Sequence, residues 1–146
     1  MPAGTAHLAQ VGIRVTNLSR SLRFYRRAFG FQEVRRGDGR GWGGGIWVQL
    51  RGPGSHQVLE LNWYPAGSRF ATRYRSGDAL DHLDMTIGPR PRKVLERAVR
   101  RALRAGARPT WLTMEASEGW TVGVEDPDGV WLQIYREPTP AERRRR

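Results

Sequence analysis

The alternation of apolar and polar residues near the N-terminus predicts a half-buried strand followed by an amphipathic helix. Within residues 10–15 every second side chain is apolar, which is typical of a strand with one face on a core. Asn17 is suited to cap a helix and Gly30 to end one. The apolar face between them consists of Leu18, Leu22, Tyr25 and Phe29. Three strands are expected to follow near residues 31–35, 46–51 and 57–63, and the glycine-rich stretch 36–45 is expected to be a mobile hairpin loop.

The second half of the chain repeats this plan. Residues 82–87 alternate as a strand, Pro91 suits the first turn of a helix, and Gly106 suits its end. The apolar positions of this helix are Val94, Leu95, Ala98, Val99 and Ala102. Further strands are expected near residues 108–114, 120–125 and 130–135, with a turn at 126–129. The order strand, helix and three strands therefore occurs twice.

This repeat predicts an α+β fold with two βαβββ modules, whose mixed sheets are cupped and carry helices on their outer face. A chain of 146 residues is long enough to bury a core as one domain. We expect the single domain 1–146 to divide into a half-unit 5–64, a linker 65–78, a half-unit 79–137 and a basic tail 138–146. The final arginines of this tail, 143–146, bring no apolar residue that could dock, and they are expected to be disordered.

Polar residues occupy matching positions on the first and last strand of each half. The spacing from Gln10 to Glu60 is 50 residues, and that from His82 to Gln133 is 51. One side of these four strands is aliphatic, and the other side carries Gln10, Arg14, Glu60, Asn62, His82, Asp84, Gln133 and Tyr135. A solvated sheet face would also be polar, but matched positions in both halves favour a small-molecule site.

The net charge of +11 raises the possibility of a nucleic-acid-binding face. The basic residues are spread along the chain, however, and no nucleic-acid-binding motif accompanies them. A solvated surface rich in arginine is the simpler interpretation, so no nucleic acid is expected as a partner. The charge does favour an anionic small molecule over a cationic one.

The chain contains no cysteine, which excludes disulfides, thiolate metal sites and cysteine nucleophiles. No apolar run is long enough to cross a membrane, and the first ten residues lack the features of a secretory signal. A cytoplasmic protein with no membrane partner is therefore expected.

Five segments together resemble the vicinal oxygen chelate superfamily, which includes lactoylglutathione lyase (glyoxalase), bleomycin-resistance proteins and ring-cleaving dioxygenases. The stretch QVGIRVTNLSRSLRFY at 10–25 and AFGF at 28–31 are similar to that family's first strand and helix. VLEL at 58–61, LDHL at 80–83 and VEDPDG at 124–129 are similar to its fourth strand, fifth strand and last turn. The resemblance covers nearly the whole chain, from about residue 7 to residue 137.

The resemblance implies a divalent metal ion held by the first and last strands of the two halves. The matching positions are Gln10, Glu60, His82 and Gln133. Glu60 is also the best candidate for a catalytic base, because lyases of the family have a glutamate base where this chain has Gln133, and an amide takes no proton. For Glu60 with His82, the alternative is a polar pair on an open sheet face. The choice among nickel, zinc, cobalt, manganese and iron stays open.

The other polar residues on this side are expected to bind substrate. Arg14 matches an arginine that holds the glutathione carboxylate in the lyases, although it can equally be an arginine in an internal salt bridge. Asn62, Asp84 and Tyr135 share its side of the sheets and complete the expected substrate-binding set.

The resemblance favours a metal-dependent lyase or isomerase similar to lactoylglutathione lyase, acting on a small, oxygen-chelating, anionic substrate. The alternative is a non-catalytic small-molecule or antibiotic-binding protein of the same fold, which the loss of the last glutamate favours. A dioxygenase would need two histidines and one carboxylate at the metal, a set that these positions lack. A homodimer is expected, and whether the site pairs halves of one chain or of two stays open.

Overall fold

The computed structural model describes every residue except 1–5, 7, 41–42, 76, 117–118 and 146. The first module consists of β1 (Gln10–Arg14), α1 (Leu18–Phe29), β2 (Gln32–Gly39), β3 (Gly45–Arg51) and β4 (Val58–Trp63). The second consists of β5 (Leu83–Thr86), α2 (Arg92–Ala105), β6 (Arg108–Ala116), β7 (Gly119–Glu125) and β8 (Trp131–Arg136), and it is followed by α3 (Pro140–Arg143). The predicted α+β class and the twofold βαβββ order are confirmed.

Each module forms its own four-stranded mixed sheet. The strand orders are β1-β4-β3-β2 and β5-β8-β7-β6, so the first and last strands of each module are neighbours. These neighbours, β1 with β4 and β5 with β8, are parallel, while the other pairs are antiparallel. A parallel pair needs a long crossover, and in each module this connection holds the helix and two strands. The parallel pairing brings positions about 50 residues apart in the sequence to the same place on the sheet.

Helix α1 covers one face of the first sheet. The side chain of Asn17 accepts a hydrogen bond from the backbone N–H of Arg20, which caps the helix, and Gly30 ends it with a φ of 73°, in the left-handed region that favours glycine. Phe24 and Tyr25 are fully buried and meet edge to face, with ring centroids 5.0 Å apart. The sheet side of this core consists of Ile13, Val48, Leu50, Leu59 and Leu61.

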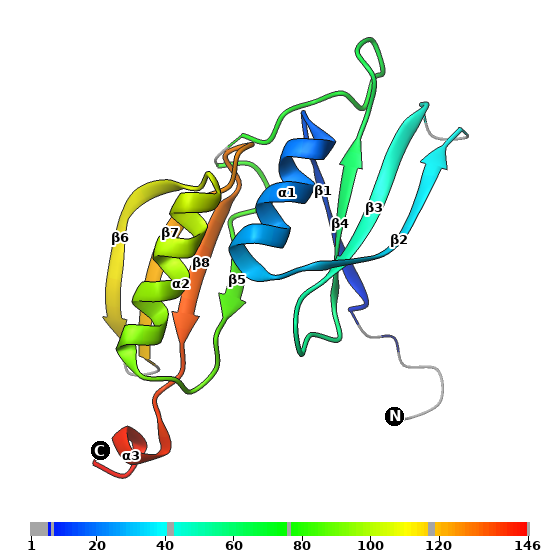
Figure 1. Ribbon diagram of the computed structural model, residues 1–146. Coiled ribbons are helices and arrows are strands. Elements are labelled where there is room, and N and C mark those ends of the chain that lie inside the picture. The colour runs from blue at the N-terminus through cyan, green and yellow to red at the C-terminus, as the bar shows by residue number, and fades with distance from the viewer. Residues whose placement is uncertain (1–5, 7, 41–42, 76, 117–118, 146) are drawn as a thin grey trace.

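Helix α2 covers the second sheet in the same way, and the two helices contact each other. Leu95 and Ala102 of α2 are buried in the same core as Val124, Leu132 and Ile134 of the sheet. At the contact between the helices, Arg101 of α2 donates a hydrogen bond through Nε to the carbonyl of Arg27. In Figure 1 the first sheet lies to the right and the second to the left, with α1 between them. Among the described residues, no helix is both long and apolar enough to span a membrane.

The turn before β8 ties the second module to the first helix. Asp128 accepts hydrogen bonds from the backbone N–H of Thr16 (3.2 Å), from Nη2 of Arg20 (2.8 Å) and from Oγ of Ser21 (3.1 Å). Asp126, which is fully buried, accepts a hydrogen bond from the Tyr25 hydroxyl (2.9 Å) and two from backbone N–H groups of its own turn. The predicted turn is confirmed, and it is also a polar link between the modules.

The expected hairpin loop at 36–45 is shorter than predicted. Strand β2 continues to Gly39 and β3 begins at Gly45, so only residues 40–44 connect them. Gly37 of β2 lies opposite Trp47 of β3. Only glycine fits at this position, because a Cβ on residue 37 would lie 2.3 Å from the indole ring. The expected mobility falls partly on residues 41–42, which lie outside the described residues.

The basic tail differs from the expectation as well. Residues 140–143 form the short helix α3, and Thr139 and Glu142 cap it reciprocally. Glu142 also pairs with Arg136, whose side chain is only 4% exposed, at 2.8 Å. A carboxylate in the tail therefore neutralises a guanidinium that the core has almost buried, and Arg143, the first of the final arginines, lies within the helix.

We expect Glu142→Gln to lower the melting temperature at neutral pH, because the nearly buried Arg136 loses its counter-charge. The hydrogen bonds from Arg136, with those from Thr139, lower the pKa of Glu142 from 4.5 to about 2. Since this pKa is depressed in the folded state, the stabilisation is complete above 4.5 and is lost as the pH falls toward about 2. Thermal melts of both proteins, recorded between pH 7 and pH 3, should show that the difference between their melting temperatures shrinks as the pH falls. Glu137→Gln, which removes an exposed pair with Arg143, is the matched control, and equal effects of both variants would contradict the prediction.

Candidate functional site

The open face of the first sheet carries an amide-lined carboxylate. Glu60, on β4, accepts hydrogen bonds from the amide groups of Gln10 (3.3 Å), Gln49 (3.0 Å) and Asn62 (3.2 Å). The neighbouring Leu59 and Leu61 point to the opposite, helix-covered side. The structure therefore brings together the predicted residues Gln10, Glu60 and Asn62, and it orients the carboxylate with three neutral donors.

Sequence reasoning missed Gln49. This residue lies on β3 opposite Glu60 and also donates to Oε1 of Gln10 at 2.9 Å, so it connects the two predicted metal ligands of the first module. The signal in the sequence was weak, since Gln49 is a polar position between the buried Val48 and Leu50. It became significant only once the register of β3 against β4 was known.

A hollow of about 430 Å³ lies over this face, next to Glu60. Its walls include Arg35 and Trp47, with the guanidinium 5.6 Å from the indole centroid, and Tyr64. Arg14 lies nearby with its guanidinium about 6 Å from the rings of Tyr64 and Phe70, and it also hydrogen-bonds the hydroxyl of Thr72. None of the described ion pairs includes Arg14.

The open face of the second sheet places His82 between two carboxylates. Nδ1 of His82 lies 3.0 Å from Oδ2 of Asp81, and Nε2 lies 3.7 Å from Oδ1 of Asp84. Asp84 is the direct strand partner of Gln133, so the two residues lie side by side on the same face. Tyr135, the last of the predicted residues, is two positions further along and pairs with Thr86.

Two indole rings lie beside this second group. The indole of Trp131 lies 6.1 Å from the His82 ring and 6.4 Å from the indole of Trp111, measured between centroids. Trp111 is 85% exposed, which is unusual for so large an apolar side chain. The second face therefore offers flat apolar surfaces on one side of an imidazole and a carboxylate.

The structure does not bring the two groups together within one chain. If both sheets closed into one cup, their helices would lie on opposite outer sides, whereas here α1 and α2 contact each other. The open faces, each turned away from its own helix, therefore do not face one another (Figure 1). Among the described residues, no three His, Asp or Glu side chains are grouped as metal ligands. We call the two groups the Glu60 half-site and the His82 half-site.

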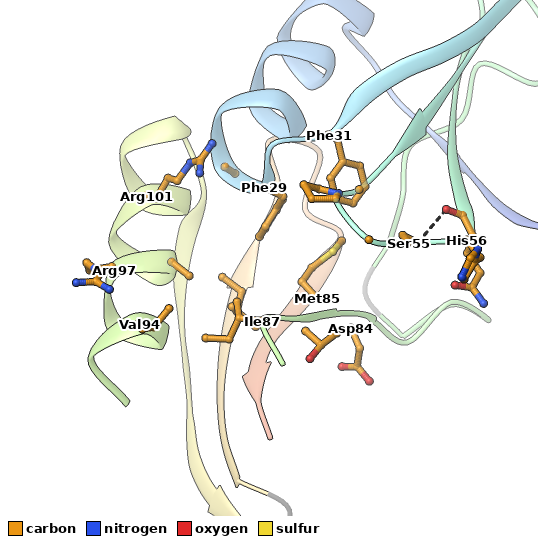
Figure 2. A pocket seen from close by; sticks show the side chains of 18 residues that line it. Phe29, Phe31, Ser55, His56, Asp84, Met85, Ile87, Val94, Arg97 and Arg101 are labelled. Carbon is orange, nitrogen blue, oxygen red and sulfur yellow. Dashed lines mark hydrogen bonds between the residues drawn. The ribbon is translucent and has the colours of Figure 1, made fainter. Parts of the chain in front are cut away.

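A second hollow, of about 590 Å³, lies between the modules rather than over either open face (Figure 2). Apolar residues from both modules line it, including Phe29, Phe31, Met85 and Ile87, with Arg97 and Arg101 on the wall formed by α2. Asp84 reaches its edge, but Glu60 does not line it. Of the residues of the two half-sites, Asp84 is the one that lines this hollow.

The arrangement matches a family of known fold. The family model described as "Glyoxalase/Bleomycin resistance protein/Dioxygenase superfamily" matches residues 7–134. The chain belongs to this superfamily. No curated protein sequence is significantly similar to the chain.

Solved structures of the superfamily share the fold of this chain. A glyoxylase/bleomycin resistance protein/dioxygenase domain from Frankia sp. EAN1pec is 23% identical with a TM-score of 0.73, over 92% of this chain and 99% of that one. The trypanothione-dependent glyoxalase I of Leishmania major is 24% identical with a TM-score of 0.68, over 91% and 88% of the two chains. A glutamate-to-glutamine mutant of the fosfomycin resistance protein FosX of Listeria monocytogenes, solved with Mn(II) and 1S,2S-dihydroxypropylphosphonic acid, is 11% identical with a TM-score of 0.67, over 97% of this chain and 99% of that one.

The donors of the two half-sites suit a divalent metal ion of the kind found in that FosX structure. They offer carboxylate and amide oxygens and one imidazole, without any thiolate, which fits an octahedral ion that tolerates oxygen ligands. Neither half-site alone provides a full set of ligands, since the first has one carboxylate among amide groups and the second has one imidazole between two carboxylates. Taken together, the donors of the two half-sites suit such an ion.

Proposed function

We propose that this chain is the subunit of a metal-dependent lyase or isomerase whose site forms between two copies. The observation that carries the proposal is the separation of two complementary half-sites on faces that turn away from each other in one chain. A second copy can set the His82 half-site of one subunit over the Glu60 half-site of the other. The twofold symmetry of such a homodimer would create two equal sites.

Each group has a defined task in this proposal. Gln10, Glu60, His82 and Gln133 would hold the ion, which would polarise two adjacent oxygens of the substrate. Glu60 would move a proton between neighbouring carbons as a base, with Gln49 and Asn62 orienting its carboxylate.

The hollow over the Glu60 half-site supports an anionic substrate. Arg35 lines this hollow and Arg14 lies beside it, and neither takes part in a described ion pair. Trp47 and Tyr64 supply flat apolar walls, a combination typical of small-molecule sites. We also expect the protein to act in the cytoplasm, because a chain without cysteine suits a reducing compartment.

A second candidate function is small-molecule binding without chemistry. Gln133 favours it, because this position offers an amide instead of the base that lyases of the superfamily have. The same hollow and the same half-sites would then sequester a ligand. The two functions differ in turnover and not in the residues that contact the ligand.

Glu60→Ala is expected to abolish both metal binding and turnover. Purified wild-type protein should take up a divalent ion, and its melting temperature should rise with added nickel, zinc, cobalt or manganese by mass action. Glu60→Ala should show no such rise, because the half-site loses its only carboxylate. Isomerisation of a hemithioacetal is then assayed with both proteins in the presence of metal. Turnover by the wild type alone indicates an enzyme, and no turnover by either protein indicates a binding protein. A wild-type melting curve that no metal changes would contradict the proposal.

A further inference from the structure

We propose that Asp84 supplies the second carboxylate that Gln133 lacks. This inference rests on the proposed function and deepens it by adding a residue to the metal-binding set. In the register of the second sheet, Asp84 on β5 is the direct partner of Gln133 on β8. Both side chains stand on the open face, because their neighbours Met85, Leu132 and Ile134 belong to or pack against the core on the other side. A carboxylate therefore lies one strand away from the position where the superfamily's lyases have their glutamate.

The distance between Asp84 and His82 fits two ligands of one ion. Nε2 of His82 and Oδ1 of Asp84 are 3.7 Å apart, which is too long for a hydrogen bond. Metal bonds to imidazole nitrogen and carboxylate oxygen are about 2.0–2.2 Å long, so two such bonds can span this separation. The half-exposed side chain of Asp84 also has room to adjust.

Asp81 prepares His82 for this role. Its carboxylate lies 3.0 Å from Nδ1 and can only accept a hydrogen bond, so the proton of the neutral ring belongs on Nδ1. Nε2 then carries the lone pair of the ring, and it lies 3.7 Å from Oδ1 of Asp84. Two acceptors that face each other in this way attract a cation between them.

The charges of the chain support this assignment. Many other described carboxylates pair with an arginine, among them those of Glu33, Asp38, Glu96, Glu125, Asp128, Glu137 and Glu142. Asp84 and Glu60 make no described ion pair with arginine or lysine, although the net charge is +11. The two half-sites therefore hold negative charge that the protein itself does not neutralise, and a divalent cation would balance it.

Manganese binding by variants of positions 84 and 133 tests the inference without an activity assay. Free Mn(II) is measured by electron paramagnetic resonance during titration of wild type, Asp84→Asn, Gln133→Glu and the double variant. We expect Asp84→Asn to weaken binding by at least about tenfold, because ligand charge dominates the affinity for such ions. Gln133→Glu in the Asp84→Asn background should restore affinity to near the wild-type value. Asp38→Asn removes an equal charge at an exposed surface pair and should change nothing.

The outcomes separate this inference from the proposed function. If His82→Ala abolishes Mn(II) binding while Asp84→Asn binds like wild type, the assignment of Asp84 is wrong and the metal site stands. If Asp84→Asn weakens binding and Gln133→Glu fails to rescue it, the two positions do not share one role, which also overturns the inference. If wild-type protein binds no Mn(II) or other divalent ion, the proposed function fails together with it. Circular dichroism melts should show that Asp84→Asn folds normally, since the side chain is half-exposed.

Discussion

Replacing Asp126 with alanine is expected to lower the free energy of unfolding by at least about 3 kcal/mol. The carboxylate is fully buried and accepts three hydrogen bonds, from the Tyr25 hydroxyl and from the backbone N–H groups of Asp128 and Val130. Alanine would leave these three donors buried without a partner, and each such group costs about 1–3 kcal/mol. It would also weaken the polar link between the turn and α1. Urea denaturation measures the change directly.

Asparagine is the matched variant at this position. Its carbonyl oxygen can keep the two backbone hydrogen bonds, and its amide can donate to the Tyr25 hydroxyl, so Asp126→Asn should cost much less than Asp126→Ala. Asp38→Ala, at an exposed ion pair, should change stability by less than about 0.5 kcal/mol. Equal losses for alanine and asparagine would show that the hydrogen bonds do not carry the stabilisation.

The pH dependence gives a second measurement on the same residue. Burial raises the pKa of Asp126 above its ordinary value of 3.8, against the opposing effect of its hydrogen bonds. The folded state therefore holds this proton more tightly than the unfolded chain does, and stability due to Asp126 falls as the pH rises above 3.8 through the raised pKa. Asp126→Asn lacks this proton, so wild type should lose stability relative to it across that range. The buried Tyr25, whose pKa is also raised by burial and then by Asp126, stays neutral there.

The elements of this fold could be predicted because local chemistry sets them. Asn17, Gly30 and Gly106 mark the ends of the helices, and each performs the expected task. Alternation located the strands that have one buried face. The end of β2 was predicted too early because several glycines and charges follow one another there, and pairing with β3 outweighs their low strand propensity.

The tail was misjudged for a different reason. A run of arginines gives no local sign of structure, and the contact of α3 with the sheet is made by Glu142, which pairs with Arg136 of the last strand. The capping pair of Thr139 and Glu142 was present in the sequence, but its value depends on that contact. Long-range ion pairs of this kind become visible only in three dimensions.

The candidate site could be predicted one module at a time. The parallel pairing of β1 with β4 places Gln10 beside Glu60, as their spacing of 50 residues suggested. In the register of β5 with β8, however, the direct partner of Gln133 is Asp84 and not His82, with which the spacing had paired it. How one module lies against the other depends on the contact between α1 and α2 and on the turn around Asp126, which alternation does not encode. The separation of the half-sites was therefore beyond the reach of the sequence pattern.

Mixing two inactive variants is expected to restore a metal site. Glu60→Ala damages the first half-site and His82→Ala the second, so homodimers of either variant should bind no metal. In a heterodimer, one site combines both damaged halves, while the other combines the intact Glu60 half-site of one subunit with the intact His82 half-site of its partner. The heterodimer should therefore bind about one ion, against about two for wild type, as twofold symmetry requires.

Two affinity tags allow the heterodimer to be purified away from both homodimers, and Mn(II) titration then counts its sites. A mixture of two separately tagged Glu60→Ala subunits is the control and should stay empty, because every site in it lacks the carboxylate. If each site were built within one chain, both chains of the heterodimer would carry a damaged site and no ion would bind. Recovery of binding thus depends on residues that meet across the subunits, whereas recovery in the Glu60→Ala control would show that this carboxylate is not a ligand.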